Sequence, residues 1–159
     1  MKYLITPILH HLIRKIIAQY QPTIIGITGN VGKTSMRNSL VAFLSQFTSV
    51  TTNYKNYNTE IGIPLSILGY SSPGKNIWKW MMILWHGWIL SWGNSKDVSN
   101  IWVIEAGIDH PGDMDTIISF LSFDIIIFGS VGEYPVHAAN FSGRDALIYE
   151  KSKILRGLK

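Results

Sequence analysis

The feature that most constrains the fold is a glycine-rich turn between an apolar run and a helix-forming stretch. The run Thr23-Ile-Ile25 leads directly into Gly26-Ile-Thr-Gly-Asn-Val-Gly-Lys-Thr-Ser35. A buried strand, a glycine turn and a Lys-Thr pair that opens a helix form the arrangement in which backbone N–H groups surround a polyphosphate. We therefore predict that this loop binds a nucleotide through its lysine, with the hydroxyl of Thr34 available to Mg²⁺.

The loop departs from the strict phosphate-loop pattern at one position. That pattern places a glycine five residues before Gly32, where this chain has Ile27, so Gly26 and Gly29 supply the turn. The alternative is a glycine turn that binds no ligand. The position of Gly-Lys-Thr-Ser, where strand and helix should meet, favours the phosphate loop.

Size and composition favour one globular domain. The chain has 159 residues, of which 47% are apolar and 15% charged, enough for a hydrophobic core. It has no cysteine, which excludes disulfides, thiolate metal sites and cysteine nucleophiles and fits a reducing compartment. The first 40 residues do not resemble a secretory signal, because His10-His11 and Arg14-Lys15 interrupt their apolar stretch. We expect a cytoplasmic protein, with peripheral contact at the inner face of the membrane left open.

The charge is distributed unevenly along the chain. Residues 1–59 carry six basic side chains and no acidic one, whereas residues 97–150 carry nine acidic side chains and the single Arg144. A basic first part suits phosphate, and an acidic second part suits a metal ion. No basic cluster has the spacing of a groove-binding surface, so we expect no nucleic-acid partner.

The hydrophobic pattern predicts alternating helices and strands. An amphipathic helix over 4–20 ends before Pro22, and strand 23–28 leads through the loop into a helix over 33–47. That helix is predicted to have an inner face of Leu40, Phe43, Leu44 and Phe47. Further along, we expect a short strand within 50–58, strands at 101–104 and 124–128, helices at 60–68, 77–92 and 112–122, and a last helix starting near Ser142 with Ser142 and Asp145 spaced as a capping box. This order predicts an α/β P-loop fold with a mostly parallel, doubly wound sheet flanked by helices.

Polar residues follow the buried strands. Glu105 ends the strand at 101–104, at the edge where open α/β sheets bind ligands, and is a candidate for holding Mg²⁺. A solvent-facing acid is the alternative. His137 follows the strand at 124–128, and Lys151 lies on the last helix. Alone, each is more commonly a solvated side chain. Asp113 suits a helix start, where an acid is favourable for structural reasons.

Four stretches together resemble the central ATP-binding domain of the Mur ligase family, over roughly residues 23–155. They are Ile-Thr-Gly-Asn-Val-Gly-Lys-Thr-Ser (27–35), Asn-Tyr-Asn-Thr-Glu-Ile-Gly-Ile-Pro (56–64), Val-Ile-Glu-Ala-Gly through Pro-Gly-Asp (103–113), and Gly-Glu-Tyr-Pro-Val-His through Glu-Lys-Ser-Lys-Ile (132–154). The second stretch has Thr59 where the family motif has a second asparagine.

The resemblance assigns roles to residues. It implies that Lys33 binds the β- and γ-phosphates, and that Glu105 ligates a metal. The metal ligands it implies are Thr34 and Glu105 for Mg²⁺, with His137 and a carbamylated Lys151 for a second Mg²⁺. Lys153 is the alternative to Lys151 if the register differs by two. The nucleotide-binding set it implies is Thr28, Gly29, Asn30, Gly32, Lys33, Thr34, Ser35 and Asn58, and the catalytic set is Lys33, His137 and Lys151.

The resemblance also implies a reaction. Family members use ATP to convert a carboxylate into an acyl phosphate, which an amine then displaces to form an amide in peptidoglycan precursor synthesis. The implied substrates are a UDP-linked muramoyl peptide and an amino acid or dipeptide.

Family enzymes have three domains, and we expect helix 1–22 and the ATP-binding domain 23–159 here, without the uridine-nucleotide and C-terminal domains. Those domains, or a partner chain, would complete the enzyme. The alternatives are another P-loop NTPase or kinase and a non-catalytic, membrane-associated nucleotide-binding module.

Residues 75–93 form an unusual insert that holds five of the six tryptophans. Trp78, Met81, Met82, Trp85, Ile89 and Trp92 share one helical face, and the opposite side is apolar too. The apolar stretch is shorter than the roughly 20 residues of a spanning helix. Three interpretations stay open: a covering helix, a helix at the membrane interface, or a docking surface for a missing domain or partner.

Overall fold

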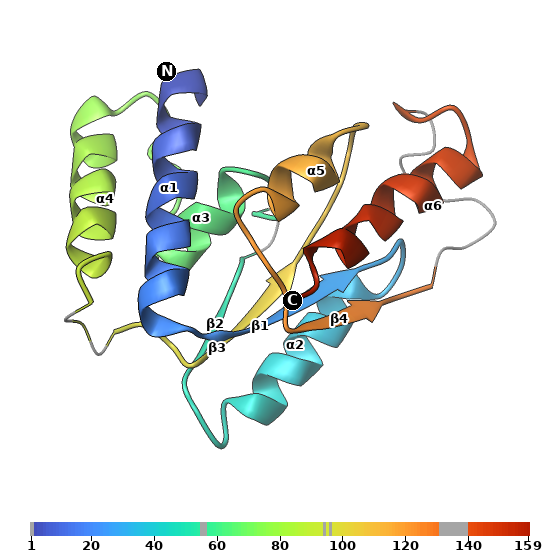
Figure 1. The fold of residues 1–159 in the computed structure, drawn as a ribbon, viewed down its shortest axis with the longest axis horizontal. Coiled ribbons are helices and arrows are strands. Elements are labelled where there is room, and N and C mark those ends of the chain that lie inside the picture. Colours follow the sequence, from blue (N-terminus) through green and yellow to red (C-terminus); the bar gives the residue numbers. More distant parts are fainter. Residues whose placement is uncertain (1, 55–56, 94, 96, 131–139) are drawn as a thin grey trace.

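The computed structural model describes residues 2–54, 57–93, 95, 97–130 and 140–159. Helices and strands alternate along the chain (Figure 1). In order, the elements are α1 (Lys2–Tyr20), β1 (Thr23–Thr28), α2 (Lys33–Leu44), β2 (Val50–Thr52), α3 (Gly62–Ile67), α4 (Ile77–Leu90), β3 (Ile101–Glu105), α5 (Asp113–Ile118), β4 (Ile125–Phe128), α6 (Arg144–Ser152) and the 3₁₀ helix η2 (Lys153–Gly157).

The four described strands form one parallel sheet in the order β2-β3-β1-β4. Strand β1 lies inside the sheet, where Ile25 pairs with Val103 of β3 on one side and with Ile125 of β4 on the other. The chain therefore places β3 and β4 on opposite sides of β1, and ligands of open α/β sheets bind at the carboxyl ends of strands beside such a switch in direction. The prediction of a parallel, doubly wound α/β sheet is confirmed.

Helices cover both faces of the sheet (Figure 1). Alternate strand residues point to opposite faces, so Ile24 and Trp102 pack with α1 and α5 in the larger core, and Ile25 and Val103 pack with α2 in a smaller one. Because both faces are buried, β1 and β3 are continuous apolar runs rather than alternating ones. This is why the sequence marks them clearly.

Two local predictions were wrong. Phe43 and Phe47 are 58% and 73% exposed, and their rings contact each other edge to face with centroids 5.4 Å apart. The prediction holds for Leu40 and Leu44, which line the inner face of α2 together with Met36, Arg37 and Val41. Arg37 is buried on that face, and a prediction from hydrophobic residues alone cannot identify a buried arginine.

The predicted capping box at Ser142 and Asp145 does not form. The N-cap of α6 is Gly143, with φ of 126°, and no side chain caps the helix. Helix α6 therefore begins one residue after the glycine, and Asp145 lies in its first turn, where the helix dipole favours an acid.

Candidate functional site

The phosphate loop connects β1 to α2 in a conformation that requires glycine. Gly29 and Gly32 have φ of 144° and 81°, which other residues rarely adopt. A Cβ at Gly29 would lie 2.9 Å from the Cα atom of Gly129, and the Asn30 N–H donates to the Ser130 carbonyl over 3.0 Å. The loop is thus held against the end of β4, and its turn leads directly into the amino end of α2.

The first residues of α2 are the predicted phosphate and metal ligands. The first N–H groups of a helix have no partner within it and carry partial positive charge, which makes this end a binding position for anions. The Nζ atom of Lys33 donates to the Asn30 carbonyl over 3.4 Å, so the lysine side chain lies along its own loop. Ser35 is exposed in the same turn, whereas the buried Thr28 donates its hydroxyl to the Ala106 carbonyl over 3.2 Å and joins β1 to the end of β3.

The two candidate ligands of Mg²⁺, Thr34 and Glu105, contact each other. Glu105 ends β3 and is buried, and its Oε2 atom accepts a hydrogen bond from the Thr34 hydroxyl over 3.0 Å. The same oxygen forms a salt bridge with Nη1 of Arg37 over 3.3 Å. The long-range pairing of β1 with β3 brings Thr34 and Glu105 together from positions 71 residues apart.

Arg37 and Asn53 complete this polar cluster, and the sequence analysis assigned neither of them to the site. Arg37 donates to the Asn53 carbonyl over 2.8 Å. The Asn53 side chain accepts from the Glu105 N–H over 2.8 Å and donates to the Glu105 carbonyl over 2.9 Å. Asn53 directly follows β2, so the strand-end argument that found Glu105 could have found it. Arg37 has a signal too, since it lies one helical turn after Lys33.

Asn58 lies beside the segment that follows β3. The N–H of Gly107 donates to the Asn58 carbonyl over 3.2 Å, and any Cβ at position 107 would collide with the Asn58 side-chain amide. Asn58 therefore packs against the turn just after Glu105. This places Asn58 beside the residues that follow β3, at the carboxyl edge of the sheet.

Lys151 and Lys153 lie in different environments. Lys151 is only 3% exposed, and burial together with the nearby charge of Lys33 lowers its pKa to about 8. Lys153 instead pairs with Asp115 and Glu150, each with a closest distance of 2.6 Å, and these hydrogen bonds raise its pKa. Of the two lysines, Lys151 is the one whose pKa is affected by the charge of Lys33 in the phosphate loop.

The available oxygen donors fit Mg²⁺. The Thr34 hydroxyl and the Glu105 carboxylate already lie within hydrogen-bond distance, and Mg²⁺ is commonly held by one or two such groups together with phosphates and water. Across the described residues, no group of three or more acidic or histidine side chains forms a separate metal cluster. His137, the predicted ligand of a second metal, lies outside the described residues.

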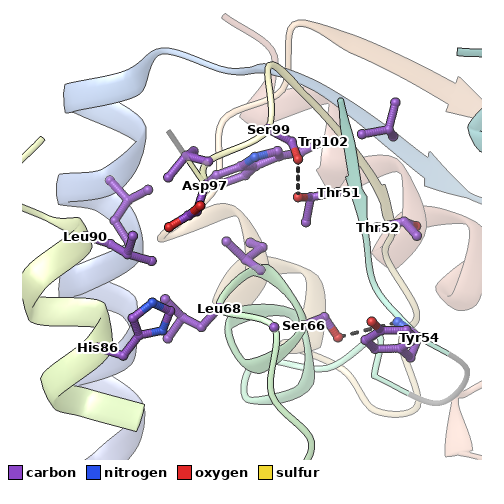
Figure 2. A pocket seen from close by; sticks show the side chains of 15 residues that line it. Thr51, Thr52, Tyr54, Ser66, Leu68, His86, Leu90, Asp97, Ser99 and Trp102 are labelled. Carbon is purple, nitrogen blue, oxygen red and sulfur yellow. Dashed lines mark hydrogen bonds between the residues drawn. The ribbon is translucent and has the colours of Figure 1, made fainter. Parts of the chain in front are cut away.

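A cavity of about 310 Å³ lies elsewhere, between α4, α3 and β2, and none of the predicted site residues lines it (Figure 2). His86 and Trp102 face it, and in the described part of the chain His86 Nδ1 and Trp102 Nε1 have no hydrogen-bond partner. A cavity of this size and polarity can hold water that would satisfy both atoms. It does not belong to the phosphate site.

A parallel sheet with a glycine loop, Lys33 and Thr34 at a helix start and Glu105 at the neighbouring strand end defines an α/β domain of the P-loop class. No family model matches the chain. It is similar to UDP-N-acetylmuramoyl-tripeptide–D-alanyl-D-alanine ligases: 29% identical over 131 residues to that of Borreliella burgdorferi, covering 82% of this chain and 22% of the relative. The Bacillus subtilis ligase is 23% identical over 151 residues, covering 95% and 27%.

Solved structures agree. The MurF ligase of Thermotoga maritima in complex with ADP matches with a TM-score of 0.71 and 25% identity, covering 97% of this chain and 30% of that one. A MurF structure from Acinetobacter baumannii matches in fold, with a TM-score of 0.69 and 24% identity over 95% and 28%. The resemblance to the Mur ligases is confirmed, and these relatives are of one ligase type. The chain spans about a quarter of the length of the curated relatives it matches.

Proposed function

We propose that this chain is the Mg-ATP-binding part of an ATP-dependent amide ligase of peptidoglycan precursor synthesis. The observation that carries the proposal is the part-buried hydrogen bond between Thr34 and Glu105 beside the phosphate loop, in a chain similar to these ligases over most of its length. The substrates would be a UDP-linked muramoyl peptide and an amino acid or dipeptide, and the site of action the cytoplasm. Further ligase domains or a partner chain would complete the site.

The chain's own residues would contribute positioning and charge. Positive φ at Gly29 and Gly32 turns the loop so that its backbone and the start of α2 can surround the phosphates. Lys33 would leave the Asn30 carbonyl to bind the β- and γ-phosphates, and Asn58 would help to place them. Such fixed donors stabilise the charge that develops as a phosphoryl group moves to a carboxylate.

Thr34 and Glu105 would hold Mg²⁺, whose bound form supplies charge neutralisation between the phosphates. For this, their mutual hydrogen bond would have to open. Arg37 and Asn53 would keep the Glu105 carboxylate in place through the contacts they already make with it. The role of a positioning residue therefore falls to Arg37 and Asn53.

Lys151 would carry a carbamate. A lysine reacts with CO₂ as the neutral amine, forming an N–C bond and releasing a proton, and its lowered pKa of about 8 makes that form accessible near neutral pH. The product is an anion, so the repulsion between Lys151 and Lys33 would become attraction. Together with His137, the carbamate would support a second Mg²⁺. A ¹³C resonance of a carbamate from labelled bicarbonate, absent in Lys151→Met, would support this assignment.

Calorimetry on the purified chain tests the proposed function. We expect binding of ATP in preference to GTP, and tighter binding with Mg²⁺ than without it. Equal binding of both nucleotides would indicate another class of P-loop protein. A well-folded chain that binds neither would contradict the proposal that this chain is a working nucleotide site.

A further inference from the structure

The outward side of α4 and the residues just after it form an apolar surface, called here the Trp face. Trp78, Trp85 and Trp92 are 78%, 66% and 70% exposed. The exposed apolar residues of this surface are Ile77, Trp78, Met81, Met82, Trp85, Trp88, Ile89 and Trp92. Contiguous exposed surfaces of large apolar side chains are uncommon in soluble proteins and mark binding surfaces.

The folded chain does not need the Trp face for its own packing. The opposite side of α4, with Trp80, Ile83 and Leu90, is buried in the core. At Gly87 the helix approaches α1 so closely that a Cβ would lie 3.0 Å from the Leu12 Cδ1 atom. Helix α4 is therefore fixed to the protein by one side, and the other side stays available.

The surroundings of the Trp face are basic. Residues 2–20 and 75–93 contain no aspartate or glutamate. Lys75 and Lys79 are exposed at the start of α4, and Lys15 of α1 lines the same hollow as Trp92. The acidic residue that follows α4, Asp97, lines the cavity on the other side of the helix with His86 and Leu90. An apolar surface bordered by lysines, on two helices without acidic residues, is complementary to a bilayer that is apolar inside and anionic at its surface.

The position of the Trp face favours a lipid surface as its partner over the further ligase domains that would close on ATP. Figure 1 shows α4 at one side of the molecule, beyond α1, and α6 with Lys151 at the other. A domain seated over the phosphate loop would therefore lie away from the Trp face. Tryptophan is enriched at the boundary between headgroups and acyl chains.

The length of α4 fixes how it would meet a bilayer. Its 14 residues span about 21 Å, short of the roughly 30 Å of a hydrocarbon core. Of the helices in the described residues, none is long and apolar enough to cross a membrane. A helix with one face fixed to the protein and one apolar face outside can lie in the plane of the interface.

We propose that the Trp face docks this protein on an anionic lipid bilayer, with α4 parallel to the surface, its tryptophans among the headgroups and the nearby lysines on the lipid phosphates. The proposal is independent of the proposed ligase function, because it uses no residue of the phosphate site.

Co-sedimentation with vesicles tests it. The purified chain is mixed with vesicles of phosphatidylcholine alone or with 30% phosphatidylglycerol, at low and high salt. We expect binding to the anionic vesicles that falls with salt, because screening weakens the lysine contribution. Absence of binding to anionic vesicles overturns the proposal.

Matched variants locate the surface. Trp78→Gln with Trp85→Gln removes two exposed aromatic side chains from α4. The control is Phe43→Gln with Phe47→Gln, which removes two exposed aromatic side chains from α2 and the turn that follows it. We expect the first pair to weaken partitioning at least tenfold and the second to change it less than twofold. Equal losses in both pairs, or unchanged binding of the first, overturn the proposal.

Two further measurements keep the test decisive. Tryptophan fluorescence of the unaltered chain should shift to the blue and be quenched by lipids brominated near the headgroups, which needs no variant; an unchanged spectrum overturns the proposal. Sedimentation velocity examines a second copy as the occupant. A dimer that the Trp78 and Trp85 substitutions dissociate, without vesicle binding, also overturns it.

Discussion

The carboxyl edge of the sheet and the Trp face both depart from the usual burial pattern: the first buries charged side chains, and the second exposes apolar ones. At the edge, Arg37, Glu105 and Lys151 are buried, although charged side chains are rarely buried unless paired. On the Trp face, large apolar side chains are exposed while their neighbours on the same helix fill the core. Both departures point to binding surfaces, but they differ in what they cost the fold.

Buried polar groups must be satisfied within the fold, so the edge is coupled to stability. Glu105, Arg37 and Asn53 satisfy one another through side-chain and backbone contacts, and removing one leaves another buried without a partner. An exposed tryptophan has no such dependent partner. Substitutions at the edge should therefore change folding and binding together, whereas substitutions on the Trp face should change folding little.

The largest effect is expected from Arg37→Met. It leaves the Glu105 carboxylate buried without its cation, and breaking a buried ion pair costs about 3–5 kcal/mol. Urea unfolding followed by circular dichroism measures the loss. Arg14→Met is the matched control, because the Arg14 side chain donates an exposed hydrogen bond to the Ser119 carbonyl. Equal stability losses in the two variants would show that the cluster at Glu105 is not special.

Lys33→Ala should weaken ATP binding by at least about a hundredfold, or about 2.7 kcal/mol, because it removes the cation of the phosphate loop. Its fold should stay intact, since Lys33 contacts only its own loop in the hydrogen bonds described. Calorimetry with Mg-ATP measures the change, and Lys15→Ala on α1, which is not a predicted site residue, is the control. Unchanged affinity in Lys33→Ala would contradict the phosphate-loop assignment.

Lys151→Met should stabilise the unmodified protein at neutral pH. The pKa of Lys151 falls from 10.5 to about 8 on folding, so between these values the unfolded chain binds more protons and stability rises with pH. Below pH 8 the folded chain bears the full cost of the buried charge. We expect a gain of about 2 kcal/mol at pH 7, reduced by relaxation around the amine and shrinking toward pH 10.

Lys153→Met gives the opposite sign and serves as the control for Lys151→Met. Hydrogen bonds to Asp115 and Glu150 raise the pKa of Lys153, so its contribution to stability is present below the unfolded pKa and is lost as pH rises through the folded pKa. Urea unfolding at pH 7 and at pH 9.5 compares the two. Loss of stability in both variants at pH 7 would show that the charge of Lys151 is stabilised by a partner rather than destabilised by burial.

Glu105→Gln should reduce the benefit of Mg²⁺ for ATP binding by about tenfold, because a neutral amide is a poorer ligand for a hard cation. The amide oxygen can still accept from Thr34, so folding should suffer less than in Arg37→Met. ATP titrations with and without Mg²⁺ measure the difference. The same Mg²⁺ benefit in the variant and in the unaltered chain would exclude Glu105 as a ligand.

The smallest effect on folding is expected from Trp85→Gln. This side chain is exposed, and surface substitutions of this kind usually change stability by less than about 0.5 kcal/mol. Urea unfolding measures it, with the buried Trp80 as the contrast, since Trp80→Gln should cost several-fold more. A large loss in Trp85→Gln would mean that the Trp face contributes to the fold itself.

Much of the scaffold could be predicted because its signals are local. The apolar run of β1, the glycine turn and the start of α2 follow one another in the chain, and strand and helix boundaries at 23, 28 and 33 agree with the structure. The place of Glu105 at a strand end follows from β3 in the same way. Two local predictions failed. Phe43 has a spacing that fits the inner face of α2, but Met36 and Val41 pack there instead. Ser142 has the spacing of a capping residue, but the N-cap of α6 is Gly143.

The sequence by itself determined the parallel α/β fold, the phosphate loop and the order of the candidate ligands, because periodicity and turn chemistry act over a few residues. Tertiary structure decided which distant groups meet. It brought Thr34 into contact with Glu105, and Arg37 into contact with Asn53. It buried Lys151 near the charge of Lys33, while Lys153 paired with Asp115. It also determined which side of α4 packs against α1. Those outcomes depend on strand pairing and helix packing between segments far apart in the chain, and no local pattern encodes them.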